Sequence, residues 1–303
     1  MPSAQRSVLL RSAFVIVASL MLAVPAAGVA QTTRHVYVTV VGNDGSPVAD
    51  LGPKDFRLRE GGRDRGIVSV EPATAPMRIA LMVEELLTPA GGVRQGLFEL
   101  AKALIGSAEI SLIVVGQSNR TAVPFTTDLN AIVAGINELP LSQPPGTAHV
   151  PEGIGQMATE FQGERHERPV MVVVALDSLQ ASAMQPQHVL NQLRDSGAQL
   201  HVVSIDAPQR ADDVAGAGGL MDTAGRAQVL GDGPRQSGGR QWPVTALTAV
   251  PRAMLSIAND LVNQYRITYV LPEGTKPSDR LDVRLNGRRD TTLRAPTRIR
   301  ADR

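Results

Sequence analysis

The sequence of 303 residues contains no cysteine. Disulfides, thiol catalysis and thiolate metal ligands are therefore excluded, so in an oxidising compartment the fold must be stabilised by its core alone. A large excess of charge is also lacking, because 30 Lys and Arg residues stand against 29 Asp and Glu. A chain this close to neutral gives no reason to expect a nucleic acid or an anionic membrane as a partner.

The common catalytic motifs are absent as well. No phosphate-binding loop ends in Gly-Lys-Ser/Thr, and Met221 stands where a dinucleotide-binding fingerprint needs its last glycine. Ser118 lacks the closing glycine of a nucleophile elbow. The 5 histidines lie in unrelated contexts without the spacing of a zinc site. Only His149, which follows a polar loop near predicted strand ends, stays a candidate site residue.

The N-terminal segment, residues 1–30, has the three parts of a secretory signal peptide. Arg6 and Arg11 precede the apolar run AFVIVASLMLAV, and small residues lead to a predicted cleavage after Ala30. The run is shorter than the ~20 residues of a membrane-spanning helix, which leaves an uncleaved anchor as the alternative. We expect a periplasmic or secreted protein with no integral membrane segment after cleavage.

The remaining chain is predicted to have three parts. Residues 31–76 read as strands, with the alternating run HVYVTVV, and residues 264–303 return to strands in YRITYVL and RLDVRLN. We expect these two ends to pair in a small β module. The basic tail carries arginines up to Arg303, and a solvated strand and tail is the simplest interpretation.

Residues 77–263 alternate apolar runs with helical stretches. The runs RIALMV, EISLIVVG, PVMVVVAL and QLHVVSI are continuous, which is typical of strands covered on both faces. This pattern predicts an α/β fold with a doubly wound, mostly parallel, Rossmann-like sheet. TAVPF is predicted as a short antiparallel edge strand, and residues 207–245 as a long, partly disordered Gly-rich connection.

Polar side chains follow each of the predicted parallel strands: Glu84 and Glu85, Gln117 and Ser118, Asp177 and Ser178, and Asp206. In open α/β sheets, ligands bind outside the carboxyl ends of the strands. These residues are therefore expected at one edge of the sheet. An unpaired carboxylate inside the sheet would cost several kcal/mol, which predicts that Glu84 and Glu85 lie where their strand ends.

In order along residues 34–295, the sequence resembles bacterial exported proteins related to the von Willebrand factor type A (VWA) domain. The resemblance is carried by LGPKDFRLREGG, PFTTDLNAIVAGINEL, PPGTAHVPEGI, PVMVVVALDS, SGGRQW and NQYRITYVLPEG. It implies that the strand ending at Glu84 lies beside the strand ending at Asp177. It also implies a metal-ion-dependent adhesion site (MIDAS) at this point, holding Mg²⁺ or Mn²⁺.

The residues of that site are only partly present here. The resemblance assigns the ligand positions to Glu84, Leu86, Thr88, Thr147 and Asp177. Leu86 has no ligating atom, and Mg²⁺ demands near-octahedral oxygen geometry at short distance. We therefore predict a degenerate site without a physiological metal and without another cofactor. Without metal, Glu84 and Asp177 are expected to face each other as like charges, which would hold one of them protonated.

Three functions follow from these observations. The first is an exported, non-enzymatic VWA-like module that binds an unidentified protein partner without strong metal dependence. The second is an exported hydrolase that uses Glu84, Glu85 and Asp177 as an acid/base cluster, since carboxylates with split pKa values run such chemistry. The third is a structural component of an envelope assembly, docked through the β module.

Overall fold

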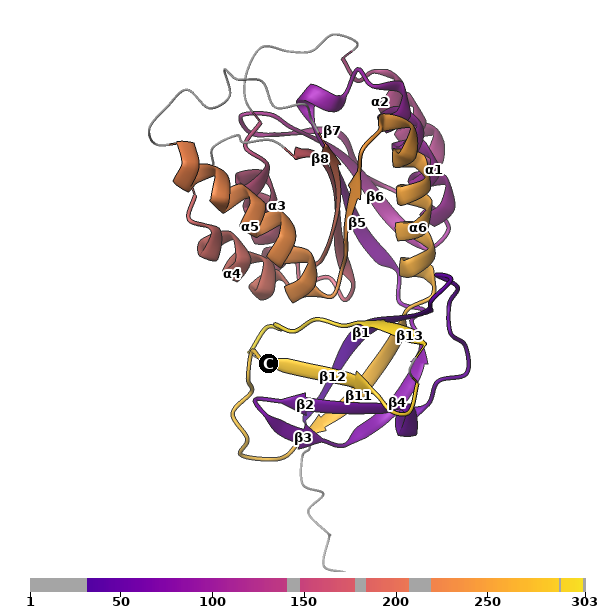
Figure 1. The fold of residues 1–303 in the computed structure, drawn as a ribbon, viewed down its shortest axis with the longest axis vertical. Helices are drawn as coiled ribbons and strands as arrows, with labels where there is room; N and C mark the ends of the chain where they lie inside the picture. The colour runs from indigo at the N-terminus through magenta and orange to yellow at the C-terminus, as the bar shows by residue number, and fades with distance from the viewer. Residues whose placement is uncertain (1–31, 141–147, 178–183, 207–218, 289, 302–303) are drawn as a thin grey trace, which may run out of the picture. The chain divides into compact units, whose positions relative to one another are not determined.

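The computed structural model describes residues 32–140, 148–177, 184–206, 219–288 and 290–301, with only the backbone for 219–223 (Figure 1). The described residues belong to one compact unit. The predicted signal segment and Thr147 lie outside them. None of the helices in the described ranges is both long and apolar enough to cross a membrane.

The central element is a six-stranded sheet with the order β10-β9-β8-β5-β6-β7. Its strands are β5 (Met77–Glu84), β6 (Ala108–Val115), β7 (Asn119–Thr126), β8 (Pro169–Asp177), β9 (Gln199–Asp206) and β10 (Gln241–Val244). All neighbouring pairs are parallel except β6 with β7, which confirms the predicted antiparallel edge strand. β5 lies directly beside β8, as the VWA resemblance implies. The predicted doubly wound α/β fold is confirmed.

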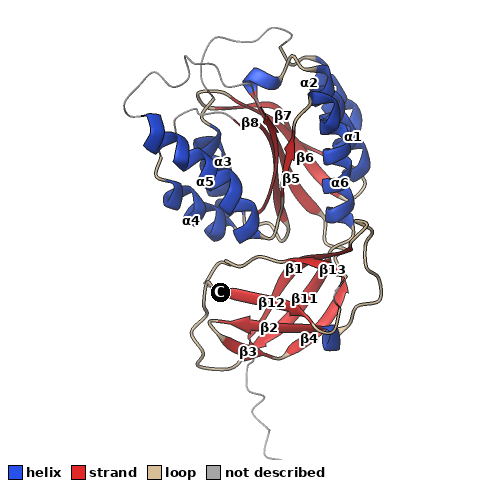
Figure 2. Cartoon of the chain, in the orientation of Figure 1, coloured by secondary structure: helices blue, strands red, loops and turns tan. Residues whose placement is uncertain are grey.

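Helices cover both faces of this sheet (Figure 2). One face carries α1 (Gly91–Leu104), α2 (Leu129–Asn137) and α6 (Val250–Val262), and the other carries α3 (Val150–Glu164), α4 (Pro186–Ser196) and α5 (Gly219–Ser237). Successive side chains of a strand point to opposite faces. Accordingly Leu81 packs in the core under α1 and α6, whereas its neighbour Met82 packs in the core under α3 and α4. Two buried faces explain why these strands are continuous apolar runs.

The two ends of the chain build the small β module that was predicted. Its strands are β1 (Thr32–Gly42), β2 (Phe56–Glu60), β3 (Arg63–Arg65), β4 (Ile67–Pro72), β11 (Tyr265–Leu271), β12 (Leu281–Leu285) and β13 (Thr291–Arg294). They form two antiparallel sheets, ordered β13-β1-β11-β4 and β12-β2-β3. N-terminal β1 and β2 thus pair with C-terminal β11 and β12. Val38, Ile267 and Tyr269 lie at the centre of a separate apolar core.

The predicted Gly-rich connection, residues 207–245, is wrong over its second half. Residues 219–237 form helix α5, and 241–244 form the parallel edge strand β10. Glycine lowers helix propensity, but tertiary packing overrides propensity. A Cβ atom at Gly233 would lie 2.8 Å from Leu200 Cδ2, and one at Gly225 would lie 3.1 Å from Pro186 Cγ. These glycines therefore let α5 approach α4 and β9 closely.

Candidate functional site

The polar strand ends meet at one edge, which we call the carboxyl edge: residues 84–88, 116–118, 177 and 206. Glu84 is in register with Val115 on β6, and Asp177 is in register with Asp206 on β9. Gln117, Ser118, Asp177 and Asp206 are exposed, whereas Glu84 is fully buried. For the residues that the structure describes, the expectation that they gather at the carboxyl ends of neighbouring strands is confirmed; Ser178 lies outside the described residues.

Glu84 turns its carboxylate into the protein. Its Oε2 atom accepts a hydrogen bond from the Leu176 backbone N–H at 2.8 Å and from Arg226 Nη2 at 2.7 Å. Burial raises the pKa of the Glu84 carboxyl, while the Arg226 guanidinium and the Leu176 N–H oppose that effect. The expectation that Glu84 and Asp177 face each other without a cation is therefore wrong, because the charge partner of Glu84 is Arg226.

Arg226 comes from α5, in the stretch that was predicted to be a loop. The side chains of the ion pair are 3% and 0% exposed, so both charges lie away from solvent. Arg226 also donates to the carbonyls of Leu176 at 2.9 Å and Ala148 at 3.4 Å. A signal for it exists in the sequence: Arg226, Val229, Leu230 and Gly233 share one helical face. All four are buried.

Glu85, the neighbouring carboxylate, behaves differently. It begins the 3₁₀ turn η2 (Glu85–Leu87) and is half-buried. Its side chain lies against Gly116, where an added Cβ atom would be 2.5 Å from Glu85 Oε2. The two adjacent glutamates at the end of β5 thus have separate environments: Glu84 is fixed by a buried cation, and Glu85 lies over the end of β6.

Thr88 closes the 3₁₀ turn and is also fully buried. Its hydroxyl donates to the Glu85 carbonyl at 2.8 Å, and its own carbonyl accepts from Arg94 Nε at 2.9 Å. The hydroxyl proton and the carbonyl of Thr88 are therefore both used in local structure.

These positions do not fit the divalent cation that the VWA resemblance implies. Glu84 already has a cationic partner, and the Leu86 side chain offers no atom that could bind a metal. Asp177 is exposed at the end of β8. In the described ranges, no three His, Asp or Glu side chains form a group able to hold a metal.

The remaining candidate, His149, lies just before α3 at the carboxyl edge. Its Nδ1 atom is 3.9 Å from Glu152 Oε1, and its backbone N–H donates to the Gly116 carbonyl at 2.8 Å. Ser118 is exposed in the turn between β6 and β7. Across the described part of the chain, no hydrogen bond joins a serine hydroxyl to a histidine ring, which is the contact that activates a nucleophilic serine.

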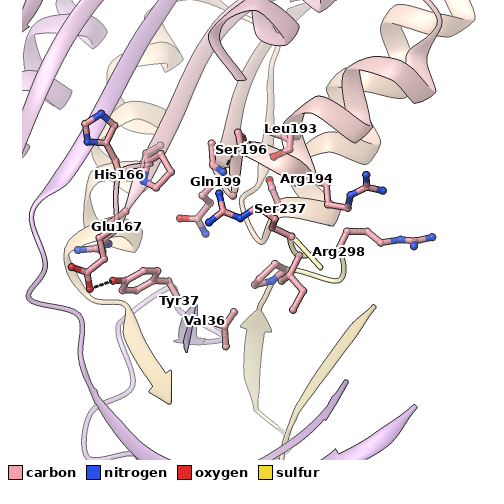
Figure 3. A pocket seen from close by; sticks show the side chains of 18 of the residues that line it. Val36, Tyr37, His166, Glu167, Leu193, Arg194, Ser196, Gln199, Ser237 and Arg298 are labelled. Carbon is pink, nitrogen blue, oxygen red and sulfur yellow. Dashed lines mark hydrogen bonds between the residues drawn. The ribbon is translucent and has the colours of Figure 1, made fainter. Parts of the chain in front are cut away.

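A cavity of about 390 Å³ lies at the opposite ends of the strands, where β8 and β9 begin (Figure 3). Its walls include Tyr37, whose O–H donates to Glu167 at 3.2 Å, and Gln199, whose amide donates to the Gly238 carbonyl at 2.6 Å. Arg298 in its lining pairs with Asp279 at 2.6 Å. α4 and α5 end at this cavity, and nearby arginines offset the partial negative charge of helix C-termini.

No protein-family model and no curated protein matches this sequence. Solved structures of similar shape include a von Willebrand factor type A protein from Catenulispora acidiphila, at 8% identity over 85% of this chain and 71% of that chain, with a TM-score of 0.46. Another is the vWF domain of the type V pili tip protein Mfa5 from Porphyromonas gingivalis, at 8% identity over 62% of this chain and 96% of that chain, with a TM-score of 0.44.

BatB from Bacteroides thetaiotaomicron, described as a conserved hypothetical protein, is 15% identical over 62% of this chain and 98% of that chain, with a TM-score of 0.42. At these identities and TM-scores the likenesses carry no argument about function. The strand order and the antiparallel edge strand β7 are those of the VWA-like fold that the motifs predicted.

Proposed function

We propose that the protein is an exported, non-enzymatic VWA-like module that binds a protein partner at the carboxyl edge, without strong dependence on a divalent cation. The supporting observation is the contrast at this edge between a buried, charge-compensated Glu84 and exposed polar side chains around it. Gln117, Ser118, Asp177 and Asp206 supply hydrogen-bonding groups and two carboxylates, the kind of surface that orients a partner.

Metal independence is supported by the ion pair with Arg226, which supplies the positive charge that a divalent cation would otherwise bring. The alternative of a hydrolase gains no support from the geometry. A catalytic carboxylate has to reach the proton that it transfers, and Glu84 is buried with its Oε2 atom in two hydrogen bonds.

Site-specific photocrosslinking in the native host tests where the partner binds. A photoreactive residue placed at Ser118 or Asp206 is expected to give an adduct with the same partner. The same residue at the exposed Arg284, on β12 of the small β module, serves as the matched control. Adducts from Arg284 alone would contradict the proposal and favour a structural component docked through the β module.

Export is tested on the same cells. Mass spectrometry of the periplasmic and secreted fractions is expected to find a mature chain that begins at Gln31, after cleavage of residues 1–30. A chain found only in the cytoplasm with Met1 retained would contradict this part of the proposal.

A further inference from the structure

The buried ion pair at the carboxyl edge joins segments that are far apart in the sequence. Glu84 and Arg226 are separated by 142 positions, and their side chains meet at 2.7 Å between Oε2 and Nη2. Both side chains are almost completely buried. Taking two charges out of water is costly and is repaid only by good geometry and further hydrogen bonds.

Further hydrogen bonds are present at Glu84 Oε2 and at both Nη atoms of Arg226, whereas Glu84 Oε1 and Arg226 Nε are buried without a hydrogen-bond partner among the described residues. Arg226 Nη2 also donates to the Leu176 carbonyl at the end of β8, and Nη1 donates to the Ala148 carbonyl just before α3. Glu84 Oε2 in turn accepts from the Leu176 N–H. One guanidinium therefore links α5 to the end of β5, the end of β8 and the start of α3. An exposed surface pair would not connect so many elements.

We propose that the Arg226 guanidinium is a built-in cation of the carboxyl edge and acts as its positioning residue. It neutralises Glu84 and ties together the ends of β5 and β8 from α5, so the protein supplies from its own chain the positive charge that the VWA resemblance would assign to a metal ion. A planar guanidinium suits this position because it presents several N–H donors in fixed directions to a carboxylate and to carbonyls. The inference deepens the proposed function and rests on its metal-independent character.

A double-mutant cycle measured by thermal melting tests the role of Arg226. Arg226→Met leaves an unpaired buried carboxylate, and we expect it to lower the melting temperature by roughly 10 °C. Glu84→Gln in the Arg226→Met background removes that charge and is expected to restore more than half of the loss. Arg226→Lys keeps the charge without the fork of donors and is expected to fall between the wild type and Arg226→Met.

The matched control is Arg235→Met, because Arg235 lies on the same helix but pairs with Asp232 at the surface, where its own side chain is 77% exposed. We expect this variant to melt within about 2 °C of the wild type. The proposal would be overturned if Glu84→Gln failed to restore stability to Arg226→Met, since the two side chains would then act independently.

Metal titration of the wild-type protein needs no variant and gives a second test. The melting temperature is expected to be the same with excess Mg²⁺, with excess Mn²⁺ and with EDTA. A saturable rise of several degrees that EDTA and Glu84→Gln both abolish would overturn the proposal. These melts require no binding partner. Failure of the Arg226 proposal, seen in the melts, can therefore be distinguished from failure of the proposed binding site, seen in the crosslinking.

Discussion

Two buried arginines lie at opposite ends of the same sheet and hold their surroundings in different ways. Arg226, at the carboxyl edge, is 2% exposed and pairs with a carboxylate. Arg168, just before β8 at the amino end, is 4% exposed and donates to the Gln264 side-chain oxygen at 2.8 Å and to the Ala75 carbonyl at 3.2 Å. It also donates to the carbonyls of Ala73 and Leu261.

The difference shows what each end of the sheet requires. Among the described residues, no carboxylate forms an ion pair with Arg168, and burial lowers the pKa of its guanidinium. Its partners are neutral oxygens, one of them the Leu261 carbonyl in the last turn of α6, where a helix leaves carbonyls without partners. Arg168 thus donates hydrogen bonds to buried neutral oxygens, whereas Arg226 compensates a buried charge. The carboxylate, not the arginine, distinguishes the candidate site.

Among the variants that separate these two roles, Arg168→Met is expected to cause the largest loss of stability. Loss of the guanidinium leaves several buried oxygens without donors, and we expect the free energy of unfolding to fall by about 3 kcal/mol. Chemical denaturation measures this change.

Neutralising a carboxylate should not repair that variant, unlike Arg226→Met. The two arginines lie roughly 25 Å apart along β8, so Arg168→Met and Glu84→Gln are expected to be additive. If Glu84→Gln restored stability to Arg168→Met, the distinction between the two ends would be refuted.

A smaller effect is expected from His201, a buried residue of β9 that forms no ion pair with an acid in the ranges the structure describes. Neither ring nitrogen has a hydrogen-bond partner in the described structure, and burial, followed by the charges of Arg294 and Arg240, lowers its pKa from 6.5 to about 3. A lowered folded-state pKa means that the unfolded chain binds the proton first. The stability from neutral His201 is therefore complete above pH 6.5 and is lost as the pH falls towards about 3.

At pH 5 this loss amounts to about 2 kcal/mol of unfolding free energy. We expect His201→Leu to flatten the pH dependence of stability between pH 7 and pH 5 by about that amount. The exposed His188 provides the matched control, and His188→Leu should leave the profile of the wild type unchanged. Identical profiles for the wild type and His201→Leu would show that His201 is not held neutral by burial.

The same comparison explains how much the sequence predicts. The strands around Glu84 and Asp177 are predictable because both faces of the sheet are buried, so that each strand is a continuous apolar run. The position of the carboxyl edge can be predicted from the residues at which the apolar strand runs end. Arg226 was missed because α5 contains Gly225, Gly231, Gly233 and Pro234, which local propensity assigns to a loop.

The features that the sequence did not predict, helix α5 and the partner of Glu84, depend on tertiary packing. Gly233 lies so close to Leu200 that the absence of a side chain is what permits the helix there, and no local pattern reports a neighbour 33 positions away. Arg226, the partner of Glu84, also lies on α5 and is 142 positions away from Glu84 in the sequence. A rule that buried carboxylates need a cation predicts that such a partner exists, but only the fold identifies it.

The smallest change in stability is expected beside Glu85, the neighbour of Glu84 at the end of β5. In Gly116→Ala the new methyl group would lie 2.5 Å from Glu85 Oε2, but the Glu85 Cβ atom is 4.0 Å away, so the carboxylate end can swing aside. We expect a loss of no more than about 0.5 kcal/mol, and no loss when Glu85→Ala is combined with it. Denaturant melts of the two single variants and the double variant measure this. A loss of several kcal/mol would mean that Glu85 is held as firmly as Glu84, and that both carboxylates at the end of β5 are fixed parts of the carboxyl edge.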